Sequence, residues 1–479
     1  MTDLLPRQRE ALDRLRAVVS SSGFIDDEAG MKSYVTDIRG RFSGRCSLVL
    51  QPASTAEVSK IVEICSQADI FITPQGGNTG LCGAAVPPTD GVNVLLSLKR
   101  MDRIRHIDPS NFTITVEAGC ILKNVQMAAH ESDRHFPLSL GAEGTCLIGG
   151  NLSTNAGGVA VLKYGNARDL VLGLEVVLAD GQIWNGLRGL RKDNTGYDLK
   201  HLFLGAEGTL GIITAATLKL FPAITSRTSA LAAFDDINDL MPIFDSLKRA
   251  LGDELIAFEY FPRFAIDLAV THVPGVSEPF DKRYNEYLLL EVGSGGDYAD
   301  LNARFEHALA QAIEHHGMAN ALIAQSQAQA SSFWRIREGF VEAQHYEGAR
   351  LMHDVSVPLS AMVEFIGRAS ERSRSIMTDV RPFAFGHVGD GNIHFHLLQP
   401  RGAAAQDFIL NRDAFEHVIY RTAQEMRGSF SAEHGIGSLK VSAMAAFKDP
   451  VELRLMATVK KALDPKGIFN PGKILPNIG

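Results

Sequence analysis

Apolar residues recur along the chain with alternating helical and strand-like spacing. In residues 47–83, Val58, Ile61, Val62 and Cys65 follow one another at i, i+3, i+4 and i+7, which is the spacing of one buried helical stripe. A short apolar run stands on each side of this stripe. The pattern predicts a strand, a helix and a second strand that runs directly into the glycine-rich stretch PQGGNTG.

Strand-like runs also come in pairs farther along the chain. Residues 106–119 predict two strands around a Pro-Ser-Asn turn, residues 121–130 predict a helix, and residues 169–184 predict an antiparallel hairpin with Asp-Gly at its turn. After residue 222, helix-like stretches alternate with strands such as EYLLLEV and FAFGHV. We therefore expect an α+β protein.

These changes of pattern suggest where the domains end. We expect a first domain over 1–222, an α+β second domain over 223–449, and a C-terminal segment over 450–479 that packs back onto another domain. A chain of 479 residues is long enough for two or three domains at ~150 residues each.

Composition excludes several classes of protein. Hydrophobic residues make up 45% and charged residues 21%, as in globular proteins. The net charge of −8 argues against nucleic acid as a partner. Five cysteines without a CxxC pair predict free thiols in a reducing compartment. Without a secretion signal or an apolar run that could cross a bilayer, we expect a cytoplasmic protein, with peripheral membrane contact left open.

Glycines cluster in three places before residue 222. They lie in residues 74–83, in 141–158, where six glycines occupy 18 positions, and in 205–211. Neither a G-x-G-x-x-G fingerprint nor a Walker sequence is present. The first cluster supplies successive backbone N–H groups that suit a pyrophosphate, although an ordinary glycine turn has the same composition.

A third pattern places histidines around a tight turn. In GHVGDGNIHFH, residues 386–396, strand-like runs flank the turn residues GDGN. We expect the turn to let His387 and His394 converge. Two imidazoles and one carboxylate, for which Glu433 is the candidate, form an open metal site with room for a substrate. A pair of core histidines beside a glycine turn is the alternative.

Several of these segments together carry a resemblance. PQGGNTGL, NLSTNAGG, NTGYDLKHLFLGAEGTLGIIT, GHVGDGNIH, AEHGIG and FNPGKIL follow in this order from about residue 40 to the C-terminus. The chain resembles the FAD-dependent D-2-hydroxy acid dehydrogenases, the group of D-lactate dehydrogenase, the glycolate oxidase flavin subunit and D-2-hydroxyglutarate dehydrogenase. The resemblance implies an FAD domain of the vanillyl-alcohol-oxidase/PCMH type, built of two α+β subdomains. It also implies a substrate (cap) domain and a C-terminal segment that returns to the FAD domain.

The resemblance also implies which residues hold FAD. Some relatives attach the flavin through a histidine after the glycine pair of the first loop. Asn78 stands at that position here, so we expect non-covalent FAD. The expected FAD-contacting residues are Pro74, Gly76, Gly77, Asn78, Thr79, Gly80, Leu81, Gly141, Gly144, Thr145, Gly149, Gly150, Ser153, Thr154, Asn155, Gly157, Gly158, Glu207, Gly208, Gly211, Ile212 and Asn470.

The same resemblance assigns the chemistry. It makes His387, His394 and Glu433 ligands of one divalent metal, with zinc expected and manganese or iron as alternatives. It makes His434 the catalytic base and Arg337 the anchor of the substrate carboxylate. The base would take the α-hydroxyl proton of a D-2-hydroxy acid while the α-hydrogen leaves as hydride to flavin N5, giving the 2-oxo acid.

The expected substrate rests on departures from the family pattern. The D-2-hydroxyglutarate branch carries a hydroxyl-bearing residue and a lysine where this chain has Val341 and Met352, and His396 replaces a further expected polar residue. We therefore expect a D-lactate-like acid ahead of D-2-hydroxyglutarate. Arg335, His345 and His353 are the candidates for a positive charge that replaces the missing lysine.

Electrons would leave to an electron-transfer flavoprotein, a quinone or a cytochrome, and a homodimer is expected. Two readings from other classes compete with this one. The chain could be a metal-dependent hydrolase or metal-binding module without flavin, or a non-catalytic flavin electron-transfer subunit.

Overall fold

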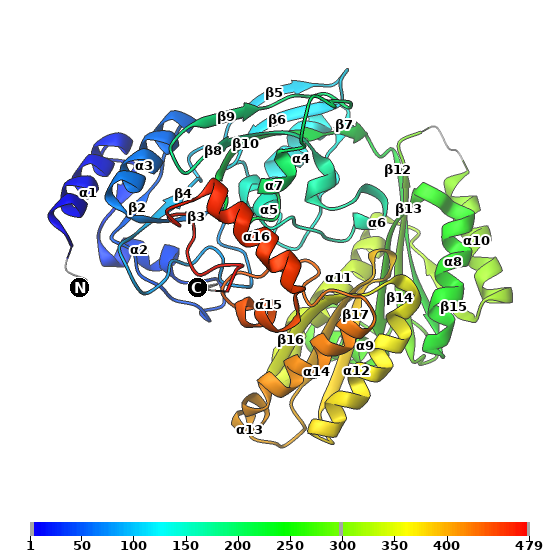
Figure 1. Ribbon diagram of the computed structural model, residues 1–479. Coiled ribbons are helices and arrows are strands. Elements are labelled where there is room, and N and C mark those ends of the chain that lie inside the picture. The colour runs from blue at the N-terminus through cyan, green and yellow to red at the C-terminus, as the bar shows by residue number, and fades with distance from the viewer. Residues whose placement is uncertain (1–3, 297–299, 477–479) are drawn as a thin grey trace. The chain divides into compact units, whose positions relative to one another are not determined.

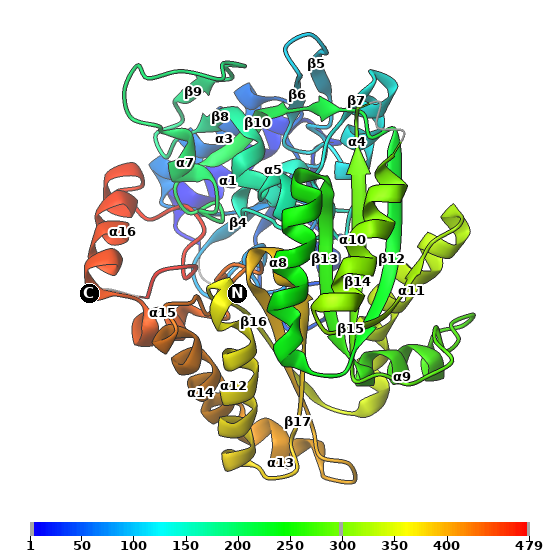
Figure 2. The same ribbon diagram turned by 90° about the vertical axis from the view of Figure 1, so that its right-hand side faces the viewer.

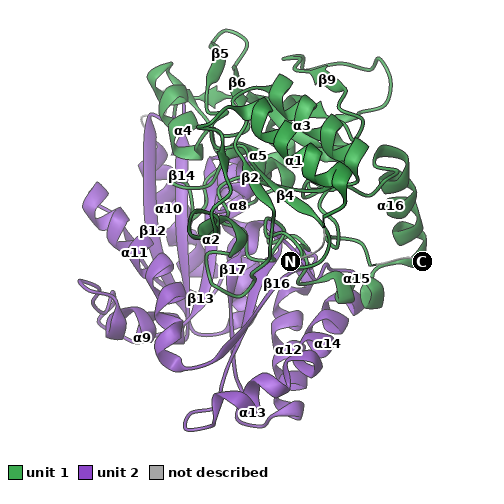
Figure 3. Cartoon of the chain, turned by 90° about the vertical axis from the view of Figure 1, so that its left-hand side faces the viewer, with its two compact units in different colours: residues 1–157, 166–223, 434–479 green, residues 158–165, 224–433 purple. Residues whose placement is uncertain are grey.

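The chain divides into two compact units in a computed structural model that describes residues 4–296 and 300–476 (Figures 1 and 3). Unit 1 comprises 1–157, 166–223 and 434–479, and unit 2 comprises 158–165 and 224–433. One change of unit, after residue 223, lies next to the expected 222/223 boundary, and residues 158–165 belong to unit 2 in addition. The last falls after Glu433, earlier than the expected 449/450, because Ser438 and Leu439 already donate backbone hydrogen bonds to Cys82 of unit 1.

The expected strand–helix–strand begins the first sheet of unit 1. The sheet runs in the order β1-β2-β4-β3, and β4 is parallel to both β2 and β3. Its strands and neighbouring helices are β1 (Phe24–Ile25), β2 (Leu48–Leu50), β3 (Phe71–Gln75), β4 (Asn93–Ser97), α1 (Pro6–Val19), α2 (Glu28–Val35) and α3 (Thr55–Ala68). Ser54 caps α3 by accepting a hydrogen bond from the Glu57 N–H.

The expected strand pairs form a second sheet of unit 1. It is antiparallel, in the order β5-β6-β10-β8-β9, and β7 pairs with β11 beside it. The strands are β5 (Ile104–Asp108), β6 (Thr113–Glu117), β7 (Arg134–His135), β8 (Val171–Val177), β9 (Ile183–Gly186), β10 (Ile212–Lys219) and β11 (Phe221–Pro222). The remaining helices of the unit are α4 (Leu122–Glu131), α5 (Ile148–Ser153), η1 (Ala167–Leu170), α7 (Lys200–Phe203), α15 (Val441–Phe447) and α16 (Pro450–Leu463).

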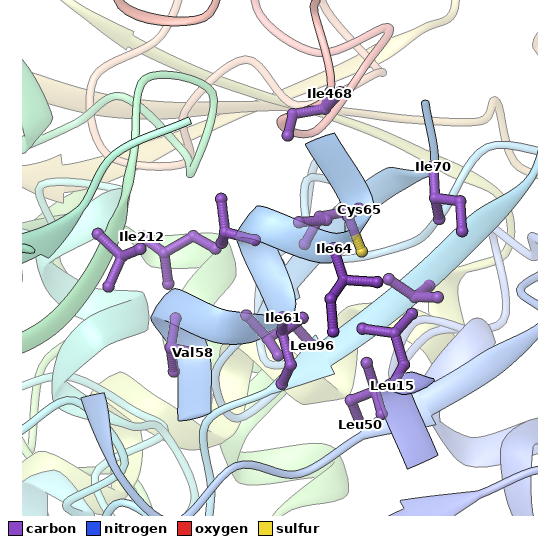
Figure 4. Close-up of a cluster of buried hydrophobic side chains, with 14 of the residues drawn as sticks. Leu15, Leu50, Val58, Ile61, Ile64, Cys65, Ile70, Leu96, Ile212 and Ile468 are labelled. Carbon is purple, nitrogen blue, oxygen red and sulfur yellow. The ribbon is translucent and has the colours of Figure 1, made fainter. Parts of the chain in front are cut away.

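The core of unit 1 forms around α3. Val58, Ile61 and Cys65, from the helical stripe seen in the sequence, are fully buried together with Leu50 of the first sheet and Ile212 of the second (Figure 4). The C-terminal segment joins this unit as well. Phe469 forms a parallel bridge with Ile72, and the Asn470 N–H donates to the Ile72 carbonyl.

Unit 2 is built on one antiparallel sheet in the order β15-β12-β14-β13-β17-β18-β16. Its strands are β12 (Ser226–Phe234), β13 (Leu255–Pro262), β14 (Glu286–Ser294), β15 (Met318–Ile323), β16 (Arg350–Ser356), β17 (Arg381–His387) and β18 (Asn392–Leu398). Its helices are α6 (Val161–Tyr164), η2 (Ile237–Asp239), α8 (Leu240–Leu251), η3 (Gly252–Glu254), α9 (Arg263–His272), α10 (Leu301–His315), α11 (Gln327–Ala343), η4 (Gln344–Glu347), η5 (Leu359–Ala361), α12 (Met362–Ile376), η6 (Val388–Asp390), α13 (Ala405–Leu410) and α14 (Arg412–Glu425).

The two faces of the unit 2 sheet are covered by different helices. Phe258 contacts Phe244 of α8 and Phe395 contacts Phe365 of α12, so α8 and α12 lie on one face (Figure 2). On the opposite face, Phe340 of α11 packs against Phe383 and Phe385. Because side chains alternate along a strand, His394 and His396 of β18 lie on the α11 face with their cross-strand partners Phe385 and Phe383.

Candidate functional site

A cluster of histidines and carboxylates lies at the α11 face of the unit 2 sheet. His387 ends β17 and His394 lies in β18, and the turn between them brings their ring centroids to 5.3 Å. Both rings face the same carboxylate. His387 Nε2 is 3.6 Å from Glu433 Oε1, and His394 Nε2 is 4.0 Å from Glu433 Oε2. The expected convergence of these three side chains is therefore present in the structure.

A carboxylate that the sequence analysis missed orients His387. Glu259 lies opposite His387 in the β13–β17 pair, is fully buried, and accepts a hydrogen bond from His387 Nδ1 at 2.5 Å. Because the Nδ1 proton is directed at Glu259, the Nε2 lone pair is left for a ligand, as in carboxylate–histidine–metal arrangements. The signal in the sequence was a lone glutamate inside the apolar run LIAFEYF.

A second missed carboxylate lies beside His394. Asp354 of β16 is 1% exposed, and its Oδ1 is 3.5 Å from His394 Nδ1. Its Oδ2 accepts the Glu433 N–H at 2.8 Å, which fixes the backbone at Glu433. Asp354, His394 and Glu433 each offer a ligand atom, and these atoms lie within 4.8 Å of one another. Asp354 is thus a further candidate ligand.

The electrostatics of the cluster suit a cation. Burial raises the pKa of Glu433 to about 7 and that of Asp390, in the turn, to about 6. Burial lowers the pKa of His387, but Glu259 and Glu433 outweigh it and raise that pKa to about 9. Buried carboxylates that resist ionisation are stabilised by a nearby positive charge. Nitrogen and oxygen donors of this kind fit a divalent cation such as zinc.

Arg337 of α11 reaches the same face. It is 7% exposed, its Nε donates to Glu259 Oε2 at 2.8 Å, and its guanidinium lies over the rings of Phe340 and Phe385. Burial raises the pKa of Glu259, but His387 and Arg337 reverse this effect and hold it at about 2. Among the described residues, the two Nη amino groups of Arg337 have no hydrogen-bond partner. Such a fork matches a carboxylate.

The residues considered for substrate choice lie on or near this face. His396 is buried, and its Nδ1 is 2.6 Å from Gln344 Oε1. Met352 lies opposite His396 in the β16–β18 pair and is half-buried. Val341 is also half-buried and packs at the edge of the apolar cluster around Phe340.

The cations suggested as compensation lie elsewhere. Arg335 and His345 are exposed. His353 is buried, and it alternates with Met352 and Asp354, so it belongs to the opposite face of the sheet, where it contacts Tyr420 of α14.

The first glycine loop offers a row of backbone donors in unit 1. Throughout the described part of the chain, no acceptor pairs with the backbone N–H groups of residues 76–81. Asn78 has a positive φ of 53°, and its side chain donates to the Thr36 carbonyl at 2.8 Å, which holds the turn. Successive unpaired amides in a left-handed turn form an anion-binding nest, so this loop fits a pyrophosphate.

The second glycine cluster packs directly against this loop. A Cβ at Gly76 would lie 3.2 Å from Gly150, and a Cβ at Gly77 would lie 2.3 Å from the Thr145 carbonyl. Cβ atoms at Gly80, Gly141 and Gly144 would meet nothing within 4 Å. Glycine is thus required at 77 for close backbone approach, and a Cβ at 76 would be tightly packed against Gly150. It leaves open space at the other three positions.

Several expected FAD contacts have other partners. The Gly158 N–H donates to Glu433 Oε1 within unit 2, and the Gly149 N–H donates to the Ala118 carbonyl. Gly211 packs against Phe203, and the side chain of Ile212 lies in the apolar core of Figure 4. Other members of the set make contacts within the loops themselves. Gly208 abuts Pro74, Thr154 donates to the Gly150 carbonyl, Asn155 accepts from the Arg168 N–H, and the Ser153 carbonyl accepts from the Glu207 N–H.

Asn470 and Glu207 connect the C-terminal segment to these loops. Asn470 Nδ2 donates to the carbonyls of Ala84 and Glu207, and among the described residues its buried Oδ1 lacks a hydrogen-bond partner. That orphaned acceptor fits a cofactor donor. Glu207 instead accepts the N–H groups of Ile436 and Gly437, each at 2.7 Å. Its carboxylate therefore fixes the loop that follows His434.

His434 is the first residue of unit 1 after the chain leaves unit 2. It is half-buried and precedes Gly435 and Gly437, whose positive φ values of 74° and 54° form a turn. In the same turn, the Gly435 carbonyl accepts a hydrogen bond from Cys82 Sγ at 3.4 Å.

Family models and curated relatives match most of the chain. The family model for FAD binding domains matches residues 46–186, and the model for C-terminal domains of FAD linked oxidases matches 224–474. A probable mitochondrial D-2-hydroxyglutarate dehydrogenase of Oryza sativa subsp. indica is 40% identical over 463 residues, covering 96% of this chain and 81% of the relative. A D-2-hydroxyglutarate dehydrogenase of Xanthomonas citri pv. viticola is 34% identical, covering 94% and 93%.

A solved structure shows the same fold. Substrate-bound p-cresol methylhydroxylase superposes with a TM-score of 0.77 at 17% identity, covering 98% of this chain and 97% of that one. The predicted α+β architecture of the vanillyl-alcohol-oxidase/PCMH type is confirmed.

Proposed function

The chain belongs to the FAD-dependent D-2-hydroxy acid dehydrogenases, and on that premise we propose that it oxidises D-2-hydroxyglutarate to 2-oxoglutarate. It is an oxidoreductase that acts on a CH–OH group with FAD. The proposal adds that FAD is bound without a covalent link, because Asn78 occupies the position of the linking histidine. It also adds a divalent cation, zinc in the first instance and manganese or iron otherwise.

One observation carries the proposal. Two imidazole nitrogens face one half-buried carboxylate, and an arginine with open amino groups lies on the same sheet face. Glu259 links the two parts, because its carboxylate accepts from both His387 and Arg337. A cation for the α-hydroxyl and a guanidinium for the α-carboxylate together recognise a 2-hydroxy acid.

Each of these residues has a distinct task. His387, His394 and Glu433 hold the cation, which lowers the pKa of the substrate hydroxyl when bound. Arg337 binds the α-carboxylate and so orients the α-carbon. His434 accepts the hydroxyl proton, a task that an imidazole performs near neutral pH. Bound FAD supplies the acceptor, at N5, for the hydride that leaves the α-carbon.

The proposed substrate reverses the order of preference that the sequence predicted for D-lactate-like acids and D-2-hydroxyglutarate. Val341 and Met352 favoured a D-lactate-like acid. The names of the relatives at 34% and 40% identity favour the dicarboxylate, and we adopt it on that support.

The proposal also includes an electron acceptor and a partner copy of the chain. Electrons pass to an electron-transfer flavoprotein, a quinone or a cytochrome, and the chain assembles as a homodimer. None of the described helices is both long and apolar enough to cross a membrane. All five cysteines are free, which supports a reducing location, the cytoplasm, with membrane contact at most peripheral.

Anaerobic titration of the purified holoprotein tests the proposal. Adding D-2-hydroxyglutarate should bleach the visible flavin band, and the L-enantiomer should not. Chelation should abolish the bleaching, and added zinc, manganese or iron should restore it. Metal analysis identifies the native ion.

The competing functions give different results. A colourless protein that binds metal and hydrolyses a substrate would support the flavin-free hydrolase. A yellow protein that no D-2-hydroxy acid reduces would support the electron-transfer subunit. Either result overturns the proposal.

A further inference from the structure

The strands that carry the histidine cluster also carry an arginine whose role is unassigned. In β16, β18 and β17, cross-strand neighbours form successive rows on the α11 face. Asp354, His394 and Phe385 form the row at the cluster, and Met352, His396 and Phe383 form the next. The third row consists of Arg350, Leu398 and Arg381. Rows are about 7 Å apart, since two residues of a strand separate them.

The two arginines of the third row differ in their partners. Arg381 is fully engaged: it pairs with the Glu347 carboxylate, and it donates to the carbonyls of Glu347 and Gln399. Arg350 makes one contact, an Nη1 donation to the Val341 carbonyl at 3.3 Å, and no described carboxylate lies within 4.0 Å of it. It is half-buried, and burial lowers its pKa. A partly buried guanidinium without a counter-ion is costly and favours an anionic ligand.

The contact with Val341 places the Arg350 guanidinium beside the last turn of α11, the helix that also carries Arg337. Val341 lies four residues after Arg337, about one helical turn along α11. Four C–C bonds separate the carboxyl carbons of a five-carbon dicarboxylate, so its two ends can meet different guanidinium groups along this face.

We propose that Arg350 binds the second carboxylate of a dicarboxylic D-2-hydroxy acid whose first carboxylate is held by Arg337. This inference rests on the proposed function and deepens it, because it assigns the residue that selects a dicarboxylate over a monocarboxylate. Met352, in the row between, supplies no charge. Arg350 would supply the positive charge for a second carboxylate that the apolar Val341 and Met352 lack.

A substrate-by-variant comparison tests the inference. D-2-hydroxyvalerate has the same chain length as D-2-hydroxyglutarate but lacks the second carboxylate. Arg350→Met should lower kcat/KM for D-2-hydroxyglutarate about 10- to 100-fold, the value of a charged hydrogen bond. It should change kcat/KM for D-2-hydroxyvalerate less than about threefold. Arg350→Lys should recover part of the loss, and Arg335→Met, which removes an exposed arginine of α11, should change neither substrate.

Equilibrium binding gives a second readout. The Kd of 2-oxoglutarate, measured by calorimetry on the FAD-loaded protein, should rise in Arg350→Met by the same factor as kcat/KM falls. The Kd of 2-oxovalerate should stay constant. Visible flavin spectra and thermal unfolding identify any variant that fails to fold, and Arg350→Lys then carries the comparison.

Failure of the inference and failure of the proposed function look different. If the wild type turns over D-2-hydroxyglutarate and Arg350→Met weakens both acids equally, the inference is overturned and the proposed function stands. If the wild type oxidises neither acid, the proposed function is overturned, and the inference that rests on it falls as well. A wild type that prefers D-2-hydroxyvalerate would also overturn the inference.

Discussion

The histidine cluster of unit 2 and the glycine loop of unit 1 offer a ligand opposite kinds of contact. In the cluster, buried and half-buried side chains carry the charge. Glu259 and Glu433 raise the pKa of His387, and His387 in turn favours the ionised form of each carboxylate. In the loop, residues 76–81 contribute backbone amides, and the glycines there serve to let the backbone of Thr145 and Gly150 approach. The cluster depends on side-chain identity, and the loop depends on backbone shape.

The difference predicts how each region fails. Removing a side chain should empty the cluster and leave the loop intact. Adding a single methyl group should disturb the loop and leave the cluster intact. Metal content and FAD content are therefore separate readouts for the two regions.

The largest effect should come from His394→Ala. Loss of one ligand nitrogen should release the cation and lower kcat by about 1,000-fold, because a Lewis acid contributes several kcal/mol. FAD content should remain at wild-type level. Metal analysis and flavin absorbance measure both, with His345→Ala, an exposed histidine, as control. A variant that retains metal and turnover would remove His394 from the ligand set.

The reciprocal effect should come from Gly77→Ala. The new Cβ would lie 2.3 Å from the Thr145 carbonyl, and overpacking of this kind costs about 1–3 kcal/mol. The Kd of FAD should rise about 10- to 100-fold while metal content stays constant. Flavin fluorescence after dilution of the protein measures the Kd of FAD. Gly367→Ala in α12, where no atom lies within 4 Å, is the matched control, and equal FAD affinity in both variants would contradict the loop assignment.

A smaller effect within the cluster should come from Glu259→Gln. The amide retains shape but loses the charge that orients His387 Nδ1 and holds Arg337. Removing such a partner lowers metal affinity about 10- to 100-fold, and FAD affinity should not change. Metal titration of the chelated protein measures the shift. An unchanged metal Kd would show that the charge of Glu259 does not contribute to metal binding.

The smallest effect should come from Glu286→Gln, which lies outside both regions. Burial raises the pKa of Glu286 to about 7, and Tyr260 donates to its Oε2 at 2.7 Å. The folded state thus retains a proton that the unfolded chain releases above about pH 4.5. The stability that this proton provides is fully present below pH 4.5 and is lost as pH rises toward 7.

Glu286→Gln should remove the loss of stability between pH 4.5 and pH 7, because glutamine does not titrate. Its Tm should exceed the wild-type Tm by several degrees at pH 8, at ~2–4 °C per kcal/mol for a unit of this size, and by little at pH 4.5. Turnover and metal content should match wild type. A Tm difference that does not depend on pH would show that Glu286 is ionised in the folded protein.

Local patterns predicted much of the fold because they reflect local physics. The i, i+3, i+4, i+7 stripe gave α3, and strand alternation gave β5–β6 and β8–β9, since each depends on neighbours in sequence. The turn chemistry of GDGN also predicted that His387 and His394 converge. Contacts distant in sequence were beyond these patterns. Glu259 reaches His387 across 128 positions, and Glu207 reaches Gly437 across 230.

By itself, the amino-acid sequence determined the family, the secondary structure around the motifs, and the set of side chains capable of the chemistry. Tertiary structure alone decided which carboxylate orients which imidazole, which glycine N–H remains unpaired, and which arginine lacks a counter-ion. Strand register and helix packing make those choices, because they bring together residues whose separation along the chain carries no signal of contact.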